Sequence, residues 1–147
     1  MKKLINYSIL FLLSLVIFSC GGPTIDADSD ESKLLTATRD FLMYKGSPFS
    51  GTLVKYHENG QLNWEENFKD GKKDGIDKKY NENGQLEKKQ SFKYNKKDGV
   101  SEEYYKNGQL EEKGNWKEGK PDGVFEYYHE DGDLEKKINY KDGRSVD

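Results

Sequence analysis

The chain has 147 residues, of which 33% are hydrophobic and 35% charged, and its formal net charge is −3. This length favours a single domain, and the slightly acidic balance argues against a nucleic-acid partner. Hydrophobic content this low lies near the boundary with disordered proteins and excludes a thick two-layer core. Ten tyrosines, seven phenylalanines and two tryptophans still provide aromatic side chains for a thinner fold.

The first 19 residues have the features of a signal peptide. A positive start, Met1-Lys2-Lys3, precedes an apolar run over 9–18 that is too short for a comfortable membrane span. The run ends in Ile17-Phe18-Ser19-Cys20, which resembles a bacterial lipobox with Cys20 as the lipidated residue. Acyl chains on Cys20 would hold the chain at a membrane. We therefore expect a lipid-anchored protein of the cell envelope, at the outer membrane and facing the periplasm or the cell surface.

Two alternatives to this lipoprotein interpretation stay open. One is an ordinary secreted protein in which the cysteine is incidental, and the other is a retained membrane helix. Because Cys20 is the single cysteine of the chain, folding cannot depend on a disulfide within it.

Three segments follow the signal peptide before the first complete repeat. Residues 20–33 hold the lipidated cysteine and a small, acidic, non-periodic stretch, which predicts a flexible tether. The folded domain is expected over 34–147. Its first part, 34–50, is predicted to be half a repeat, with a leading strand over 34–44.

From residue 51 the sequence repeats with a period of 24 residues and no insertion. The units are 51–74, 75–98, 99–122 and 123–147. A fixed period in this range is typical of repeat architectures. Each unit contains a glycine at its turn (Gly60, Gly84, Gly108, Gly132), a tyrosine before that turn (Tyr56, Tyr80, Tyr104, Tyr128) and a later aromatic residue followed by lysine (Phe68, Phe92, Trp116, Tyr140).

Each unit predicts a β-hairpin. In the first unit, strands over 51–57 and 61–69 flank a three-residue loop whose last position, Gly60, requires a positive φ. A register that pairs Tyr56 with Leu62 and Val54 with Trp64 places the recurring rings on one face and leaves a charged, wet face opposite. The units together predict an all-β fold, a single-layer antiparallel meander of about nine strands whose two edges need protection.

One consequence of that register is unfavourable. It places Lys78 opposite Lys88 and Glu102 opposite Glu112 at the centre of the apolar face, and like charges directly across a strand pair destabilise a sheet. The alternative is a two-sided sheet with ionic stripes that is exposed on both faces.

The recurring pattern G-x(4)-Y-x-x-N-G-Q-L-x(5)-aromatic-K resembles the MORN repeat variant over about residues 40–147. The last unit departs from it, with Asp131 and Asp133 in place of asparagine and glutamine. The resemblance implies a β-hairpin sheet with a binding or scaffolding role and no reaction. Some bacterial members carry the label of antitoxin components, so an antitoxin-like role is an alternative that rests on this label.

No motif for catalysis, cofactor binding or metal binding is present, so we expect a non-enzymatic protein. The two histidines, His57 and His129, lie beside hairpin turns and are expected to be surface residues. The remaining candidates for binding are aromatic, because a single layer cannot cover its apolar face and leaves rings open to a partner. They are Tyr56, Tyr80, Tyr104, Tyr128, Phe68, Phe92, Trp116, Tyr140 and Trp64. The alternative is that these rings only pack the fold itself.

Two functions remain as expectations. The first is a membrane-anchored binding or scaffold module whose sheet contacts another protein. The second is a cell-wall or carbohydrate-binding lipoprotein that uses the aromatic row against an envelope glycan.

Overall fold

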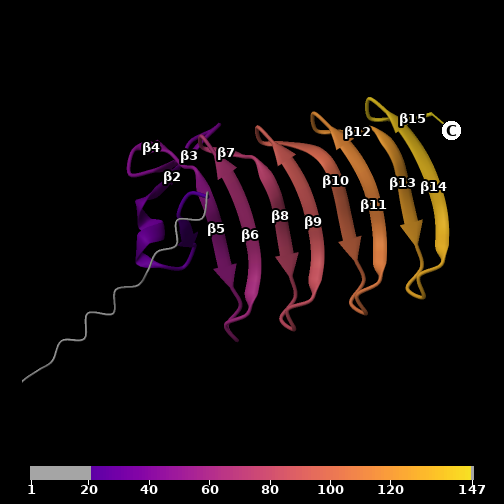
Figure 1. Cartoon of the computed structure of the whole chain (residues 1–147), viewed down its shortest axis with the longest axis horizontal. Helices are drawn as coiled ribbons and strands as arrows, with labels where there is room; N and C mark the ends of the chain where they lie inside the picture. Colours follow the sequence, from indigo (N-terminus) through magenta and orange to yellow (C-terminus); the bar gives the residue numbers. More distant parts are fainter. Residues whose placement is uncertain (1–20, 147) are drawn as a thin grey trace, which may run out of the picture.

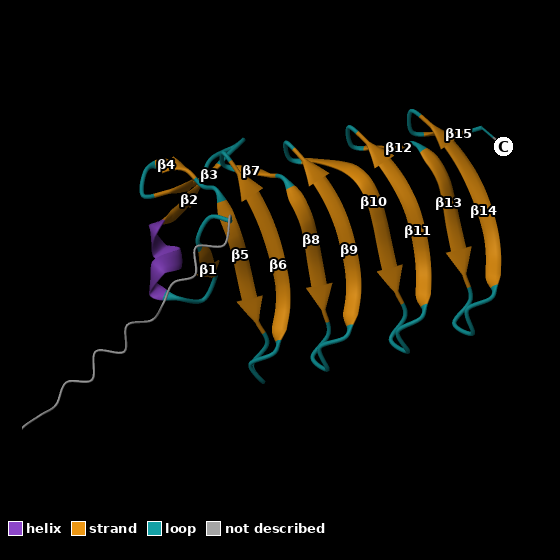
Figure 2. Ribbon diagram, viewed as in Figure 1, coloured by secondary structure: helices purple, strands orange, loops and turns teal. Residues whose placement is uncertain are grey.

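The computed structural model describes residues 21–146, and within them the chain forms one long, open, antiparallel sheet (Figure 1). The predicted signal peptide and Cys20 lie outside the described residues. A small second sheet and a short 3₁₀ helix lie at the amino-terminal end, beside the first strands of the long sheet (Figure 2). The predicted all-β, single-layer meander is confirmed.

The elements follow the repeat. The long sheet contains β1 (Thr24–Asp26), β5 (Gly51–Tyr56), β6 (Leu62–Lys69), β7 (Lys72–Lys73), β8 (Gly75–Tyr80), β9 (Leu86–Lys93), β10 (Lys96–Tyr104), β11 (Leu110–Lys117), β12 (Lys120–Pro121), β13 (Gly123–Tyr128), β14 (Leu134–Lys141) and β15 (Arg144–Ser145). The small sheet contains β2 (Leu35–Ala37), β3 (Leu42–Tyr44) and β4 (Ser47–Pro48), and the 3₁₀ helix is η1 (Asp30–Leu34).

The predicted hairpin loops are confirmed. In the first unit the Gly60 N–H donates to the His57 carbonyl at 2.9 Å, and the His57 N–H donates to the Gln61 carbonyl at 2.8 Å. Gly60 has φ +82°, and the equivalent glycines of the other units are also left-handed. This geometry is the type I turn with a glycine bulge that the spacing predicts.

The turns between units bind each unit to the one before it. Asp70 and Gly71 have φ of 49° and 77°, and Tyr94 and Asn95 have φ of 50° and 67°. Two consecutive left-handed residues form the tight turn that suits the twist of antiparallel strands. The Asn95 N–H then donates to the Lys73 carbonyl at 3.0 Å. Neighbouring units are thus linked by backbone bonds, as in other repeat folds.

The hairpin register differs from the predicted one by a single residue. Tyr56 pairs with Leu62 as expected, but Val54 pairs with Glu65 because Asn63 is an extra residue at a β-bulge. The predicted pairing of Val54 with Trp64 is therefore wrong. The same irregularity recurs in the other three units.

This bulge divides the rings between the two faces. Because side chains alternate along a strand, a shift of one residue moves them to the opposite face. The prediction that all recurring rings share one face is therefore wrong, and charged residues occur on both faces. The shift places Glu102 opposite Lys113 instead of Glu112, but Glu112 now faces Glu103. In the second unit Lys78 faces Lys89 and Lys79 faces Lys88, so like charges still oppose each other within these hairpins.

We name the two faces by their aromatic residues. The tyrosine face carries Thr52, Ile76, Val100, Val124; Val54, Lys78, Glu102, Glu126; Tyr56, Tyr80, Tyr104, Tyr128; Leu62, Leu86, Leu110, Leu134; and Glu65, Lys89, Lys113, Lys137. The tryptophan face carries Leu53, Asp77, Ser101, Phe125; Lys55, Lys79, Glu103, Tyr127; Trp64, Lys88, Glu112, Lys136; Glu66, Gln90, Gly114, Ile138; and Phe68, Phe92, Trp116, Tyr140.

Residues 24–34 belong to the folded domain, in contrast to the flexible tether expected from their composition. Strand β1 pairs in parallel with β5 and covers the first edge of the long sheet. Ile25 of β1 is 1% exposed and Phe49 is 2% exposed, and these are the largest fully buried side chains of residues 21–146. Asp28 forms an ion pair with Lys55 at 3.5 Å.

The predicted leading strand over 34–44 does not join the long sheet. Strands β2 and β3 pair with each other and with β4 instead. The ring of Phe49 connects this small sheet to the long one, because it lies 6.1 Å from the Tyr44 ring and 5.9 Å from the Phe68 ring.

Candidate binding surfaces

The tyrosine face exposes a row of aliphatic side chains. Ile76, Val100 and Val124 occupy the same position in successive units and are 41%, 41% and 49% exposed. Tyr56 and Leu134 of the same face are also exposed. Ser91 and Asn115 of the intervening strands lie between these aliphatic positions. Exposed apolar side chains gathered on one face make that face a candidate interaction surface.

Next to this row runs a stripe of ion pairs. The Glu102 carboxylate lies 3.2 Å from Lys113 Nζ and 3.4 Å from Lys89 Nζ, and it accepts a hydrogen bond from the Tyr104 hydroxyl at 3.2 Å. Burial alone would raise the pKa of Glu102, but the two lysines and the tyrosine outweigh burial and lower the pKa below its usual 4.5. The stripe is thus ionised and internally paired.

The tyrosine rings stand on the other side of this stripe, toward the hairpin loops. Tyr80, Tyr104 and Tyr128 are half-buried, and the Tyr128 hydroxyl donates to Glu126 at 3.1 Å. The structure therefore brings these predicted binding residues together on one face, with part of their hydroxyl bonding capacity already used.

The other predicted aromatic residues lie on the tryptophan face and pack tightly. The Phe125 ring lies 5.8 Å from Trp116 and 5.0 Å from Tyr140 in edge-on contacts. Lys97 Nζ lies 4.1 Å from the centre of the Trp116 ring, at cation–π distance. Lys73 Nζ lies similarly over the ring of Phe92 at 5.1 Å. Trp116 Nε1 is buried and has no hydrogen-bond partner in the described chain.

Neighbouring hairpins meet through a different contact at each junction of the tryptophan face. At the first, Lys73 Nζ bridges Glu66 at 2.5 Å and Asp77 at 2.9 Å. At the second, the buried Gln90 amide donates to the Ser101 hydroxyl at 3.2 Å. At the third, the Phe125 ring fills the space that a side chain on Gly114 would need.

Sequence reasoning missed these junction residues. The signal was present, because the residues at these two positions of the repeat vary together from unit to unit. A charged pair, a polar pair and a glycine with a phenylalanine succeed one another. The predicted register did not place these two positions of adjacent hairpins side by side, so their joint variation could not be interpreted until the bulge was known.

Comparison with known families assigns the repeat. The family model described as the MORN repeat variant matches residues 50–70, 73–94, 97–118 and 121–142. The chain belongs to the MORN repeat variant family. Each matched segment spans one hairpin, and consecutive segments are separated at the tight turns between units. No curated protein is similar enough to this chain to count as a match.

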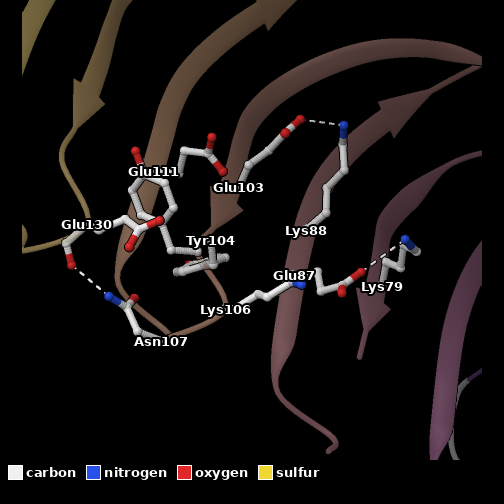
Figure 3. Close-up of a pocket in the computed structure, with 10 residues that line it drawn as sticks. Lys79, Glu87, Lys88, Glu103, Tyr104, Lys106, Asn107, Glu111 and Glu130 are labelled. Carbon is white, nitrogen blue, oxygen red and sulfur yellow. Dashed lines mark hydrogen bonds and ion pairs between the residues drawn. The ribbon is translucent and has the colours of Figure 1, made fainter. Parts of the chain in front are cut away.

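The MORN hairpins form a shallow groove near the loops of the second and third units (Figure 3). Four of its charged side chains form ion pairs: Lys79 with Glu87 at 2.9 Å, and Lys88 with Glu103. The Asn107 amide donates to the Glu130 backbone carbonyl at 2.6 Å. The groove therefore has a mixed polar and charged lining, which also includes Lys106 and Glu111.

Two neighbouring side chains on the tryptophan face of the MORN sheet have raised pKa values. Burial and the neighbouring Glu103 raise the pKa of Glu112. Burial and then Glu112 raise the pKa of Tyr127 to about 12. Both shifts favour the neutral form of the group, and packing on the tryptophan face explains them.

The predicted surface positions of the histidines agree with the structure. His57 is half-buried beside the first loop, with Nε2 at 2.9 Å from the Tyr80 carbonyl, and His129 is exposed. Within residues 21–146, no group of three or more His, Cys, Asp or Glu side chains is arranged to hold a metal ion. The helices that the structure describes include none of sufficient length and hydrophobicity to span a membrane.

Proposed function

We propose that this chain is a non-enzymatic binding module, anchored to a membrane through Cys20, whose tyrosine face contacts another protein. The observation that carries the proposal is the exposed row of Ile76, Val100 and Val124, repeated at the spacing of the units. Aliphatic side chains flanked by charged and tyrosine side chains are typical of protein interfaces, which combine an apolar centre with a polar rim.

A glycan partner is less well supported. A sugar-binding shelf needs open ring faces, and rings of the tryptophan face are instead occupied by lysines or by Phe125. The antitoxin-like role gains no support from any contact described above.

The start of the fold bears on the proposed anchor. A Cβ atom on Gly22 would lie 2.0 Å from the Ser50 carbonyl oxygen, so the chain is already packed against the domain two residues after Cys20. A lipid on Cys20 would therefore hold the small sheet and β5 close to the membrane surface, with the units extending away from that end.

A crosslinking experiment in intact cells tests the binding face. A photoreactive residue at Val100 should give a protein adduct, and the charged substitutions Ile76→Glu and Val124→Glu beside it should abolish that adduct. The same photoreactive residue at Val146, which is exposed but lies outside the aliphatic row, is the matched control. Equal adducts from both positions, or no loss in the charged variants, would contradict the proposal.

The anchor has its own test. The cell-envelope fraction should contain the protein with acyl chains detectable on Cys20 by mass spectrometry, and Cys20→Ser should release the protein into the soluble fraction. An unacylated Cys20 in envelope material would rule the anchor out while leaving the binding face untouched.

A further inference from the structure

The two edges of the long sheet are protected unequally. At the amino-terminal edge, β1 covers β5 with backbone hydrogen bonds from Thr52 N–H to Pro23 and from Ala27 N–H to Val54, at 3.0 Å and 2.7 Å. At the other end, β14 is the last long strand, and within residues 21–146 the short β15 is the element that pairs beside it, opposite Tyr140 and Lys141. Figure 1 shows β14 at the end of the sheet.

Such an edge is a template for another strand. The part of β14 before Tyr140 is mostly exposed, with Lys136 and Lys137 about half exposed and Ile138 half-buried. At the equivalent positions of the earlier units, the next hairpin pairs with the strand: Trp64 with Lys79, and Glu65 with Lys78.

The junctions between hairpins inside the sheet show which side chains pair with the residues equivalent to Lys136 and Lys137. Lys78 and Glu65 form an ion pair at 2.6 Å, Lys89 and Glu102 form one at 3.4 Å, and Lys88 pairs with Glu103. At the positions equivalent to Lys136 and Lys137, every charged pair across these junctions is of opposite sign: Lys113 also lies opposite Glu126 in the register of β11 and β13. Opposite charges on adjacent strands stabilise a pairing, and like charges oppose it.

The junction of β9 with β10 is the nearest guide to the open edge. Strand β9 presents Lys88 and Lys89, as β14 presents Lys136 and Lys137, and it is covered by the consecutive acids Glu102 and Glu103 of β10. The next residue toward the end of β14 is Ile138, whose equivalent Gly114 contacts the buried Phe125 of the following strand. A strand that matches β14 therefore carries an apolar residue followed directly by two acids.

The chain's own first strand does not offer this match to another copy. Strand β5 has Val54 and Lys55 at the corresponding positions, so a second copy added end to end would bring Lys55 beside Lys136. It is also covered by β1, and Lys55 is paired with Asp28.

We propose that the open edge of β14 is a second binding site, which takes an acidic β-strand of a partner protein with the order apolar, acid, acid. The partner strand lies antiparallel to β14, with its apolar residue beside Ile138 and its acids beside Lys137 and Lys136. This site deepens the proposed role in protein binding, but it uses a different surface from the aliphatic row of the tyrosine face.

A charge-exchange experiment tests the edge. The probe is a cyclic hairpin peptide copying residues 97–118 with Ser101→Leu, which supplies the leucine followed by Glu102 and Glu103. It should bind the full chain about tenfold or more tighter than the same peptide with Glu103→Lys. Lys136 is the residue to exchange in the protein, because its ion pair is with the adjacent Glu135, whereas Lys137 pairs with Glu126 of β13. Its contact with β13 is the Tyr127 ring, whose centre lies 4.8 Å from Lys136 Nζ. The Lys136→Glu protein should reverse the preference and bind the Glu103→Lys peptide better.

The outcomes separate the edge from the face. Equal binding of both peptides, or an unchanged preference in the Lys136→Glu protein, would overturn the edge proposal. So would a stable dimer that Lys136→Glu dissolves, because a second copy would then occupy the edge. The Val124→Glu protein, altered on the tyrosine face, should bind the acidic peptide normally. If Val100 gave no crosslink but the Lys136→Glu protein still reversed the peptide preference, the tyrosine-face proposal would be refuted and the edge proposal would stand.

Discussion

At the scale of single residues, the stability of this thin sheet depends on a few positions where neighbouring side chains are complementary in size or in charge. Gly114 and Phe125 form one such match. A Cβ atom on Gly114 would lie 2.2 Å from Cε1 of the Phe125 ring, and that ring is buried. Because the fold has so few buried apolar side chains, a mismatch here has little surrounding structure to absorb it.

Gly114→Ala is expected to lower the free energy of unfolding by about 1–3 kcal/mol, since the methyl group must displace a packed ring. Chemical denaturation measures the loss. Adding Phe125→Leu to Gly114→Ala should recover part of it, because the smaller side chain makes room. The matched control is Gly108→Ala, where nothing lies within 4 Å but φ is +87°; it should cost about 1–2 kcal/mol through strain alone, and Phe125→Leu should not repair it.

Two glutamates of the third unit should have opposite effects on stability. The folded-state pKa of Glu102 is lowered, so its contribution is present above pH 4.5 and disappears as the pH falls through the lower folded value. The folded-state pKa of Glu112 is raised by burial and by Glu103, so its charge destabilises the fold at neutral pH and this effect disappears on acidification.

Thermal unfolding between pH 3 and pH 7 checks the sign of both effects. Glu102→Gln should lower the midpoint at pH 7 and flatten its decline in acid. Glu112→Gln should raise the midpoint at pH 7, with a difference from the unchanged protein that closes as the pH approaches about 4. A rise for Glu102→Gln, or a fall for Glu112→Gln, would contradict the charge arrangement described here.

At the scale of the elements, the bulge after each hairpin loop decides what the strands present. It follows Leu62 in the first unit and recurs in every later one. Bulges increase local twist and redirect side chains. Here they bring Glu102 opposite Lys113 and place Trp64 and Trp116 on the face opposite the tyrosines that precede the hairpin loops.

A pair of engineered disulfides distinguishes the bulged register from the flat one. Cysteines at Glu102 and Lys113, which face each other in the bulged register, should oxidise to a disulfide because facing Cβ atoms lie within bridging distance. Cysteines at Glu102 and Glu112, the facing pair of the flat register, are the control and should remain largely reduced. Both variants carry Cys20→Ser, and mass spectrometry reads the bond. Preferential bonding of the second pair would refute the bulge.

At the scale of the whole molecule, the sheet is asymmetric from end to end. Its amino-terminal edge is paired with β1, with η1 and the small sheet beside it (Figure 2), whereas within residues 21–146 the short β15 pairs with only the end of the last long strand, β14. Each unit of a repeat protein contacts only its neighbours, so each terminal unit has one side that no other unit covers. The first edge is protected by residues 24–26 of the chain itself, and the proposed partner strand would protect the exposed part of β14.

Ile25→Ala tests the closed end. Removing a side chain that is 1% exposed should lower the free energy of unfolding by about 2–5 kcal/mol, because a buried isoleucine cut to alanine leaves a cavity. Denaturant unfolding gives the value. Ile76→Ala, in the exposed row, is the matched control and should cost about 1 kcal/mol or less. An Ile25→Ala protein as stable as the control would mean that residues 24–34 are a tether after all.

The local features of the fold could be predicted from the sequence, since their causes are local. The period of 24 residues, the hairpin in each unit and the left-handed glycines such as Gly60 follow from residue spacing and backbone sterics, and all three are confirmed. The row of Tyr56, Tyr80, Tyr104 and Tyr128 on one face follows from the same spacing. Whether those rings bind a partner stays a prediction.

The tertiary structure decided what depends on a shift of one residue or on contacts between distant segments. The bulge at Asn63 leaves no mark in the sequence that a flat hairpin would lack, yet it moves Phe68, Trp64 and Trp116 away from the tyrosines. The burial of Ile25 against β5 depends on a segment whose polar composition hides it. Which face a side chain occupies and which edge is covered both depend on how the strands pair, and the pairing is set by contacts that a single strand's sequence does not specify.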